Sequence, residues 1–493
     1  MKSYILAIDQ GTTGTRAILY NRSGRPVAQA YQEITQHFPK PGWVEHDPEQ
    51  LWGSAVQVIH RCVAASGVRA AEIAAIGITN QRETTILWDR KSGRPLHRAI
   101  VWQDRRTADI CRQLKRHESV ARRLTGLVLD PYFSGTKLCW LQRHDPRVAR
   151  AVRLRQAVFG TVDCWLLWRL TGGRAHATDV TNASRTLLWD LRSGRWSETM
   201  RKMLGVPESL LPEVYPSSHR FGVTVSGCGL PAGIPITGIA GDQQAALFGQ
   251  GCTEPGAVKN TYGTGCFLLM QTGRRVVQSK HGLIATAACD ANGQPAFALE
   301  GSVFIAGAAI QWLRDGLGLV RSASETEKLA RSIKDTGGVY LVPAFVGLGA
   351  PYWRPDCRGL ICGLTRGTGV AHLVRAALES IAFQSQEVLA AMEQDSRIRL
   401  RSLKVDGGAV RNNFLLQFQS DLSGVPVVRP KIIETTALGA AQLAGLGVGL
   451  WTRKDLARMR GVDRVFRPAW SPAQRKRAMT SWADAIRRTL SSR

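Results

Sequence analysis

The sequence DQGTTGTR occupies residues 9–16 and lies between two short apolar runs, residues 4–8 and 17–20. The first run is typical of a strand buried in a central sheet, and glycine with threonine between two strands favours a hairpin turn. Such a turn offers backbone amides and hydroxyls that can bind phosphate oxygens. It differs from the strand-loop-helix phosphate cradle, because the GK[ST] ending of that motif is absent from the sequence. Taken alone, the segment is more typical of a purely structural hairpin.

A second turn of glycine and threonine occurs in the other half of the chain, where residues 256–267 read GAVKNTYGTGCF. Two such turns predict two similar α/β sheet domains that each present a hairpin to one shared phosphate chain. A third glycine site, VDGGAVRNN at residues 405–413, is typical of a strand, a backbone break and a helix N-terminus. We expect a flat base or a phosphate to lie against the backbone there.

Length and composition limit the class of protein. A chain of 493 residues is too long for one compact core, so its length predicts two or three domains. Apolar residues make up 44% and charged residues 21%, and no apolar run is long enough to span a membrane. No secretory cleavage pattern follows the first apolar run, and the ten cysteines show no metal-binding spacing. We therefore expect a cytoplasmic protein with reduced thiols.

The basic charge of the chain raises the question of a nucleic-acid partner, because the formal net charge is +27. The arginines are dispersed, and in the densest part, residues 453–493, they are mixed with Asp455, Asp463 and Asp484. The sequence does not interleave basic with aromatic residues in the way that single-strand binders do. We expect weak, salt-sensitive anion binding and no specific nucleic-acid partner.

Two sites place charged residues at the ends of predicted strands. Residues 73–79 form an apolar run that leads to Arg82 and Glu83, and ligands bind at the carboxyl ends of strands in open sheets. A surface ion pair is the alternative. Residues 238–248, GIAGDQQAALF, predict a strand followed by Asp242 at the start of a helix. Asp242 is then either an ordinary N-cap or the base of a reaction.

Six motifs carry a family resemblance. They are DQGTT at 9–13, TNQRETT at 79–85, WQDRRT at 102–107, GIAGDQQ at 238–244, NTYGTG at 260–265 and DGGAVRNN at 406–413. With them the chain resembles, over nearly its whole length, the FGGY carbohydrate kinases of the actin, hexokinase and heat-shock chaperone ATPase superfamily. The resemblance implies an α/β fold of two actin/hexokinase-like (ribonuclease H-like) domains, at residues 1–249 and 250–493, with the active site in a cleft between them. It implies ATP-dependent phosphorylation of glycerol to sn-glycerol 3-phosphate, which feeds glycerol catabolism and glycerolipid synthesis.

The resemblance also implies roles for individual residues. Those implied to contact glycerol are Arg82, Glu83, Trp102, Tyr132, Asp242, Gln243 and Phe267. Those implied to surround ATP or ADP are Thr12, Thr13, Gly14, Arg16, Gly263, Thr264, Gly307, Gln311, Gly408 and Asn412. Asp242 would accept the proton of a glycerol hydroxyl as that hydroxyl attacks the γ-phosphorus. Asp9 would hold Mg²⁺ through water, because magnesium dehydrates reluctantly.

Two positions depart from the pattern of the family. Gly14 stands where many relatives carry serine, which removes one hydroxyl from the phosphate turn but keeps its amide. Gly233, in the loop CGLPAG at residues 228–233, stands where relatives regulated by fructose 1,6-bisphosphate carry arginine. We therefore expect no inhibition by fructose 1,6-bisphosphate.

The sequence leaves three functions open. The first is phosphorylation of glycerol, and the second is phosphorylation of a larger polyol or sugar by a related kinase. The third is a nucleotide switch or basic binding protein without catalysis, which has no need for the Arg82-Glu83 pair or for Asp242 and Gln243. A homodimer or homotetramer is expected.

Overall fold

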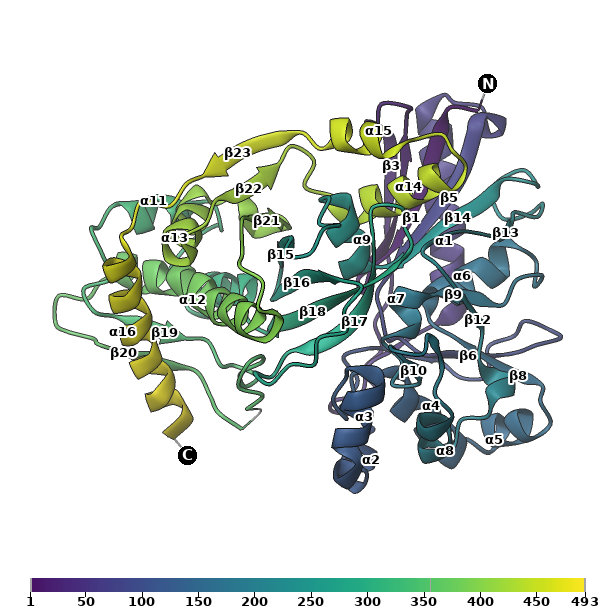
Figure 1. The fold of residues 1–493 in the computed structure, drawn as a ribbon, viewed down its shortest axis with the longest axis horizontal. Coiled ribbons are helices and arrows are strands. Elements are labelled where there is room, and N and C mark those ends of the chain that lie inside the picture. The colour runs from purple at the N-terminus through teal and green to yellow at the C-terminus, as the bar shows by residue number, and fades with distance from the viewer. Residues whose placement is uncertain (1, 355, 492–493) are drawn as a thin grey trace.

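The computed structural model describes residues 2–354 and 356–491, and Figure 1 shows two α/β halves, each built around one mixed sheet. The first sheet has six strands in the order β13-β14-β5-β1-β2-β3. They are β1 (Tyr4–Gln10), β2 (Gly14–Tyr20), β3 (Pro26–Glu33), β5 (Ile73–Asn80), β13 (Ser218–Val223) and β14 (Pro235–Gly241). β1, β5 and β14 run parallel, whereas β1, β2 and β3 form an antiparallel meander. Asp9 pairs with Arg16, so the hairpin predicted at residues 9–16 is confirmed.

Helices cover both faces of the first sheet, because its central strands are apolar on both sides. α1 (Pro48–Ser66) and α6 (Val162–Leu170) pack on the face that carries Leu6 and Ile8. α1 begins after an N-cap aspartate, Asp47, whose carboxylate accepts from the N–H of Glu49 at 2.9 Å. The opposite face packs against α14 (Thr435–Gly447) and α15 (Arg453–Met459).

α14 comes late in the sequence yet lies on the first sheet, beside β1 and β5 (Figure 1). Glycines permit this close approach. A Cβ on Gly77 would lie 2.2 Å from the carbonyl oxygen of Ala440, and a Cβ on Gly439 would lie 1.9 Å from that of Ala245 in α9 (Asp242–Gly249). α14 therefore fixes the position of α9. The domain division between residues 249 and 250 stays a prediction. It assigns α14 and α15 to residues 250–493, although both helices pack on the first sheet.

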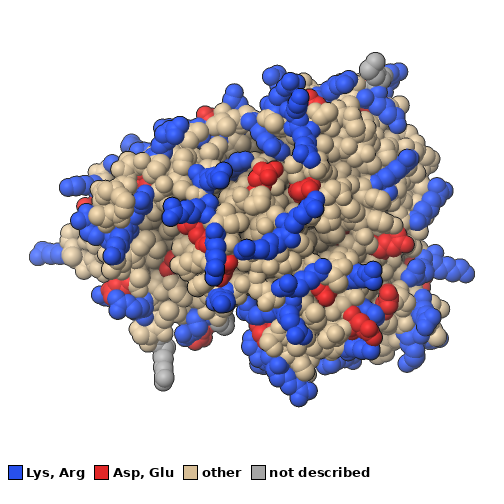
Figure 2. All heavy atoms as spheres, in the orientation of Figure 1, with Lys and Arg blue, Asp and Glu red and all other residues tan. Residues whose placement is uncertain are grey.

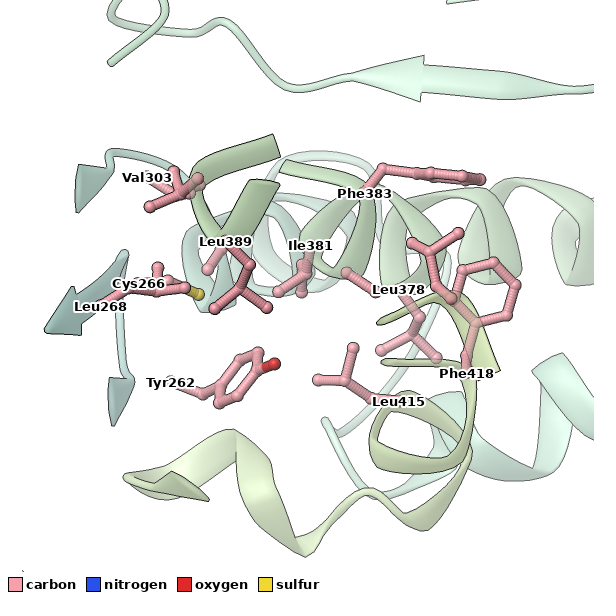
Figure 3. Packing of buried hydrophobic residues seen from close by; sticks show 14 of the residues in the cluster. Tyr262, Cys266, Leu268, Val303, Leu378, Ile381, Phe383, Leu389, Leu415 and Phe418 are labelled. Carbon is pink, nitrogen blue, oxygen red and sulfur yellow. The ribbon is translucent and has the colours of Figure 1, made fainter. Parts of the chain in front are cut away.

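The second sheet has seven strands in the order β17-β18-β16-β15-β21-β22-β23. They are β15 (Val258–Tyr262), β16 (Cys266–Gly273), β17 (Ile284–Cys289), β18 (Pro295–Val303), β21 (Leu403–Asp406), β22 (Val427–Pro430) and β23 (Val462–Phe466). β15 and β16 form the second predicted hairpin, which is thereby confirmed. Tyr262 and Leu268 pack against Ile381 and Leu389 of α12 (Val370–Ser396) and against α13 (Asn413–Ser423), as Figure 3 shows.

A smaller unit with its own apolar core lies between β5 and β14 in the sequence. Its elements include β6 (Ile86–Asp89), β7 (Ala99–Ile100), α2 (Ala108–Gln113), α3 (Glu118–Thr125), α4 (Ser134–His144), α5 (Pro146–Arg153), β8 (Ala157–Gly160) and α8 (Glu198–Leu204). Trp102 follows β7 and Tyr132 precedes α4. This unit therefore brings two aromatic side chains to the turn between β1 and β2.

The distribution of charged side chains and the state of the cysteines match the expectations of dispersed basic residues and reduced thiols. Figure 2 shows Lys and Arg side chains spread over the visible face with acidic side chains between them. All ten cysteines are free, and nine of them are buried. Within residues 2–354 and 356–491, none of the helices combines the length and apolar character that crossing a membrane requires.

Candidate active site

The first hairpin exposes backbone donors beside β5. The N–H of Gly11 donates to the carbonyl of Gly14 at 2.9 Å and closes the turn. Gln81, just after β5, donates to the Gly11 carbonyl at 3.2 Å and fixes the turn against the sheet. The N–H groups of Thr12 and Thr13 have no acceptor among the described residues. They are free to bind an anion, as a phosphate site requires.

Asp242 is the first residue of α9, and Gly241 occupies the N-cap position. The interpretation of Asp242 as an ordinary N-cap is therefore wrong. Its Oδ1 accepts from the N–H of Gln243 at 2.7 Å and lies 3.2 Å from Nε of Arg82. The side chain is 31% exposed, whereas Arg82 beside it is buried. The carboxylate is thus held on one oxygen and accessible to a ligand.

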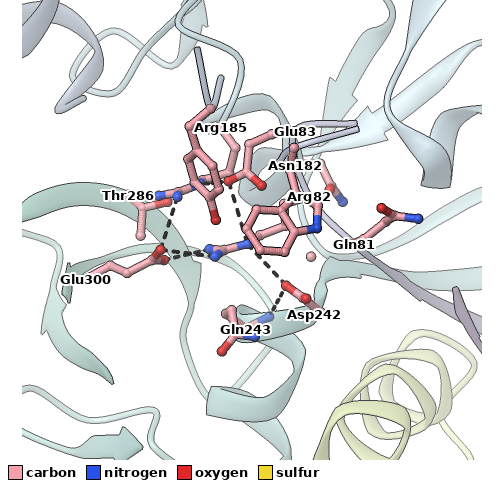
Figure 4. A network of polar contacts seen from close by, with 12 residues as sticks. Gln81, Arg82, Glu83, Asn182, Arg185, Asp242, Gln243, Thr286 and Glu300 are labelled. Atoms are coloured by element: carbon pink, nitrogen blue, oxygen red, sulfur yellow. Dashed lines mark hydrogen bonds and ion pairs between the residues drawn. The ribbon is translucent and has the colours of Figure 1, made fainter. Parts of the chain in front are cut away.

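Arg82 belongs to a buried network of ion pairs that joins the two halves (Figure 4). Its Nη1 donates to Oε2 of Glu300 at 2.6 Å, and its Nη2 donates to Oε1 at 3.0 Å. Glu300 lies on β18 of the second sheet, whereas Arg82 follows β5 of the first. Burial would raise the pKa of Glu300, but Arg185 and Arg82 outweigh it and lower this pKa to about 2. The carboxylate is therefore ionised at neutral pH and holds Arg82 in one orientation.

Arg185 closes the network from a third segment of the chain. Its Nε donates to Oε1 of Glu83 at 2.6 Å, and its Nη2 donates to Oε1 of Glu300 at 3.1 Å. Its guanidinium carbon lies 5.6 Å from the ring centre of Tyr132. Two arginines and two glutamates, all nearly inaccessible, thus balance one another's charge. The interpretation of Arg82 and Glu83 as a surface ion pair is wrong, because both are buried.

The aromatic residues of the predicted polyol site meet beside this network. Trp102 and Tyr132 pack edge to face with their ring centres 5.6 Å apart, and Nε1 of Trp102 donates to Oγ1 of Thr12 at 2.8 Å. Lys137 on α4 donates to the carbonyls of Tyr132 and Glu83 at 2.8 and 3.1 Å. Burial lowers the pKa of Lys137 to about 7. These contacts fix Glu83 although its φ of 63° lies in the left-handed region.

Gln243 and Phe267 complete the set of predicted polyol contacts. Lys259 on β15 donates to Oε1 of Gln243 and, at 2.8 Å, to Oγ1 of Thr261. Phe267 is half-buried on β16 and pairs with Ser302 of β18, two residues along the strand from Glu300. The second sheet therefore contributes Phe267, Lys259 and Glu300 to a site whose other residues come from the first half.

The second hairpin meets two further glycine sites. The N–H of Gly263 donates to the carbonyl of Gly265 at 2.9 Å, and the N–H of Gly307, the first residue of α10 (Gly307–Gln311), donates to the carbonyl of Gly263 at 3.0 Å. Gly407, with φ of 90°, would place a Cβ 2.5 Å from the carbonyl oxygen of Tyr262. Thr264 and Gly408 are therefore brought to one region, with Gly408 exposed.

Gln311 and Asn412 lie on the elements that follow these glycines. Gln311 is exposed at the end of α10. Asn412 is the N-cap of α13, where its Oδ1 accepts from the N–H of Leu415 at 3.0 Å and its Nδ2 donates to Oγ1 of Thr326 at 3.2 Å. The side chain of Asn412 thus also has a structural role in starting α13.

Asp9 and Arg16 lie opposite each other at the first hairpin. Arg16 forms an ion pair with Glu434, which immediately precedes α14. Burial and then the nearby carboxylate of Asp242 raise the pKa of Asp9 to about 7. Among the described residues, no group of three or more His, Cys, Asp or Glu side chains could hold a metal ion. A cation at Asp9 would therefore take most of its ligands from water or from a bound phosphate.

Sequence reasoning missed Arg185, Glu300, Lys259 and Lys137 as members of the site. Arg185 is 102 residues from Glu83, and Glu300 is 218 residues from Arg82. No local pattern relates such distant positions. The only signal in the sequence is a charged residue that follows an apolar strand-like run, as Glu300 follows residues 296–299.

The two-domain fold and the residues of this site define the class of protein to which the chain belongs. Residues 4–249 match the N-terminal domain, and residues 258–448 the C-terminal domain, of the FGGY family of carbohydrate kinases, and the chain belongs to this family. The predicted two-domain α/β fold is confirmed. The chain is 56% identical over 490 residues to the glycerol kinase of Carboxydothermus hydrogenoformans, covering 99% of this chain and 98% of the relative. It is 54% identical over 497 residues to that of Leptothrix cholodnii, covering 99% and 100%. The crystal structure of Plasmodium falciparum glycerol kinase with ADP superimposes with a TM-score of 0.93 at 38% identity, covering 99% of this chain and 98% of that one.

Proposed function

We propose that this protein transfers the γ-phosphoryl group of ATP to glycerol and forms sn-glycerol 3-phosphate. The observation that carries the proposal is the setting of Asp242. Its carboxylate is accessible, is held by Arg82 at 3.2 Å, and is close enough to the first hairpin for its charge to raise the pKa of Asp9. The full-length likeness to the glycerol kinases named above supports glycerol as the acceptor.

Asp242 acts as the general base. One oxygen accepts a hydrogen bond from the N–H of Gln243 and pairs with Arg82, so the other is available to accept the proton of a terminal hydroxyl of glycerol. The hydroxyl oxygen then attacks the γ-phosphorus in line, the bond from this phosphorus to the bridging oxygen breaks, and ADP leaves. Phosphoryl transfer depends mainly on positioning and charge neutralisation. A base on the first turn of α9 supplies the positioning.

Glycerol binds between the buried ion pairs and the aromatic pair. Arg82, Glu83 and Gln243 donate to or accept from its hydroxyls, while Trp102, Tyr132 and Phe267 cover its carbon chain. Because the buried polar groups would lose their partners with a ligand that lacks a hydroxyl, such a site discriminates strongly. The mutual fixation of Arg82 and Glu83 through Glu300 and Arg185 supports this role, since it orients both before a ligand arrives.

The nucleotide binds across the two hairpins. Thr12, Thr13, Gly14 and Arg16 of the first hairpin, and Gly263 and Thr264 of the second, surround the phosphates. Gly307, Gln311, Gly408 and Asn412 surround the nucleoside. The free N–H groups of Thr12 and Thr13 support the first assignment, and the close packing of Gly307 and Gly407 on the second hairpin supports the last.

Magnesium fits the carboxylate at the first hairpin. Burial and the negative charge of Asp242 raise the pKa of Asp9. A bound cation would offset the repulsion between these two carboxylates. Asp9 would hold Mg²⁺ through water, and the ion would neutralise charge on the phosphates. The homodimeric or homotetrameric state and the cytoplasmic location also stay predictions.

A panel of acceptors tests the proposed function. Purified protein with ATP and MgCl₂ is assayed for ADP release with glycerol, dihydroxyacetone, xylulose and gluconate. Glycerol should give the highest kcat/KM, and mass spectrometry should identify glycerol 3-phosphate as the product. Robust turnover of a sugar with none of glycerol would overturn the proposal, as would nucleotide binding without turnover of any acceptor.

A further inference from the structure

The phenol of Tyr31 lies against Gly14 at the first hairpin. A Cβ on Gly14 would lie 2.5 Å from Oη and 2.6 Å from Cε2 of Tyr31, and 2.6 Å from the carbonyl oxygen of Gln32. A side chain at position 14 would therefore occupy the space that the Tyr31 hydroxyl fills. The glycine and the tyrosine are sterically dependent on each other.

The strand register explains how Tyr31 reaches the hairpin. Tyr31 on β3 pairs with Arg16 on β2, and Gly14 lies two residues nearer the turn. Side chains two residues apart on a strand share a face of the sheet, so Arg16, Tyr31 and the missing side chain of Gly14 all belong to the same face. The guanidinium carbon of Arg16 lies 5.7 Å from the ring centre of Tyr31. The phenol thus leans along β3 from Arg16 toward the phosphate turn.

The hydroxyl of Tyr31 is available for a ligand. The residue is 44% exposed, and its Oη has no hydrogen-bond partner among the described residues. Oη lies against the backbone of Gly14, which follows the free N–H groups of Thr12 and Thr13 in the chain, and the Tyr31 ring lies over Arg16, whose guanidinium also pairs with Glu434. A neutral hydroxyl in this setting is a donor to an anionic oxygen.

We propose that Oη of Tyr31 donates a hydrogen bond to a phosphate oxygen of the nucleotide at the first hairpin and supplies the hydroxyl that Gly14 lacks. This inference rests on the nucleotide site of the proposed function. Tyr31 is then a further nucleotide-binding residue, reached from the neighbouring strand and not from the turn itself. It accounts for the departure at position 14 without loss of a phosphate donor.

Tyr31→Phe tests the proposal, because it removes the hydroxyl and keeps the ring on Arg16. Isothermal titration calorimetry should show ADP binding weakened about three- to tenfold, as expected for an accessible hydrogen bond to a charged group. Binding of adenosine, which has no phosphate, should change by less than a factor of about 1.5, and KM for glycerol should not change. Tyr4→Phe is the matched control, since Tyr4 is a half-buried residue on β1 of the same sheet, and it should leave ADP binding unchanged.

Two results would overturn the proposal. One is ADP binding by Tyr31→Phe within a factor of about 1.5 of the wild type, and the other is equal weakening of ADP and adenosine, which would indicate a general effect on the fold. Since ADP binding is measured without turnover, failure of the glycerol assay in the wild type tests the proposed function separately.

Discussion

Gly439→Ala should displace the helix that carries Asp242. α14 meets α9 through backbone atoms, and a Cβ on Gly439 would lie 1.9 Å from the carbonyl oxygen of Ala245 and 2.6 Å from its carbonyl carbon. Gly249 makes the reciprocal contact, with a Cβ position 2.2 Å from the carbonyl oxygen of Thr435. Because protein interiors are close-packed, the two helices must separate by more than about 1 Å to admit the methyl group.

Separation of the two helices would displace Asp242, the proposed general base. Asp242 is the first residue of α9, and its contact with Arg82 is only 3.2 Å long. A misplacement of about 1 Å can cost on the order of 10²-fold in rate, and overpacking costs about 1–3 kcal/mol of stability. We therefore expect kcat of Gly439→Ala to fall about 10- to 100-fold and the free energy of unfolding to fall by about 1–3 kcal/mol.

The assay compares kcat with stability in a matched pair of variants. Gly53 lies within α1, and a Cβ there meets nothing within 4 Å. Gly53→Ala should thus raise the free energy of unfolding by about 0.5–1 kcal/mol through helix propensity and leave kcat unchanged. Steady-state kinetics and urea denaturation measure both quantities. Wild-type kcat and stability in Gly439→Ala would refute the steric reasoning.

Three further predictions follow from the site. Glu300→Gln should raise KM for glycerol about 10- to 100-fold and keep KM for ATP within about threefold, because Arg82 loses the carboxylate that orients it. Glu379→Gln is the control, since Glu379 pairs with Arg375 on α12, and it should leave both KM values unchanged. Equal effects of Glu300→Gln on the two KM values would contradict the role of Glu300 in orienting Arg82. Burial lowers the pKa of Lys137 from 10.5 to about 7, so between these values the unfolded chain binds the proton and the folded chain does not. The contribution of Lys137 to stability therefore rises with pH in this window. The stability of wild type minus that of Lys137→Met, measured by denaturation from about pH 7 to about pH 10, should therefore increase; a difference that is constant with pH would count against the shift. Because Gly233 offers no cation, millimolar fructose 1,6-bisphosphate should not inhibit the enzyme, and a titration that shows inhibition would contradict this.

The sequence predicted those parts of the site that are local in the chain. The two hairpins, the pair Arg82-Glu83 and the helix start at Asp242 each consist of neighbouring residues, so composition and strand pattern suffice to find them. α14 is another local feature, because its sequence, TTALGAAQLAGLG at residues 435–447, is apolar on nearly all sides. A helix that is apolar on all sides indicates burial, but it does not indicate which sheet the helix covers.

The remaining parts depend on contacts between distant segments. Glu300 becomes the partner of Arg82 only when β18 of the second sheet meets the end of β5 of the first. Arg185 joins them from the segment before β14, and no periodicity links its position to theirs. Tyr31 likewise gains its place beside Gly14 through the register of β2 and β3. These contacts arise from tertiary packing between residues far apart in the chain, and no spacing pattern in a single sequence predicts them.

The role of Asp242 as the base is the central claim, and Asp242→Asn tests it most directly. The amide keeps the size of the side chain but cannot accept the proton, so kcat for glycerol phosphorylation should fall by a factor on the order of 10² to 10⁴. Glycerol binding, measured by calorimetry, should stay within a few-fold of the wild type, because Arg82 and Glu83 remain fixed by their own ion pairs. A kcat within about threefold of the wild type would contradict the role of Asp242 as the general base.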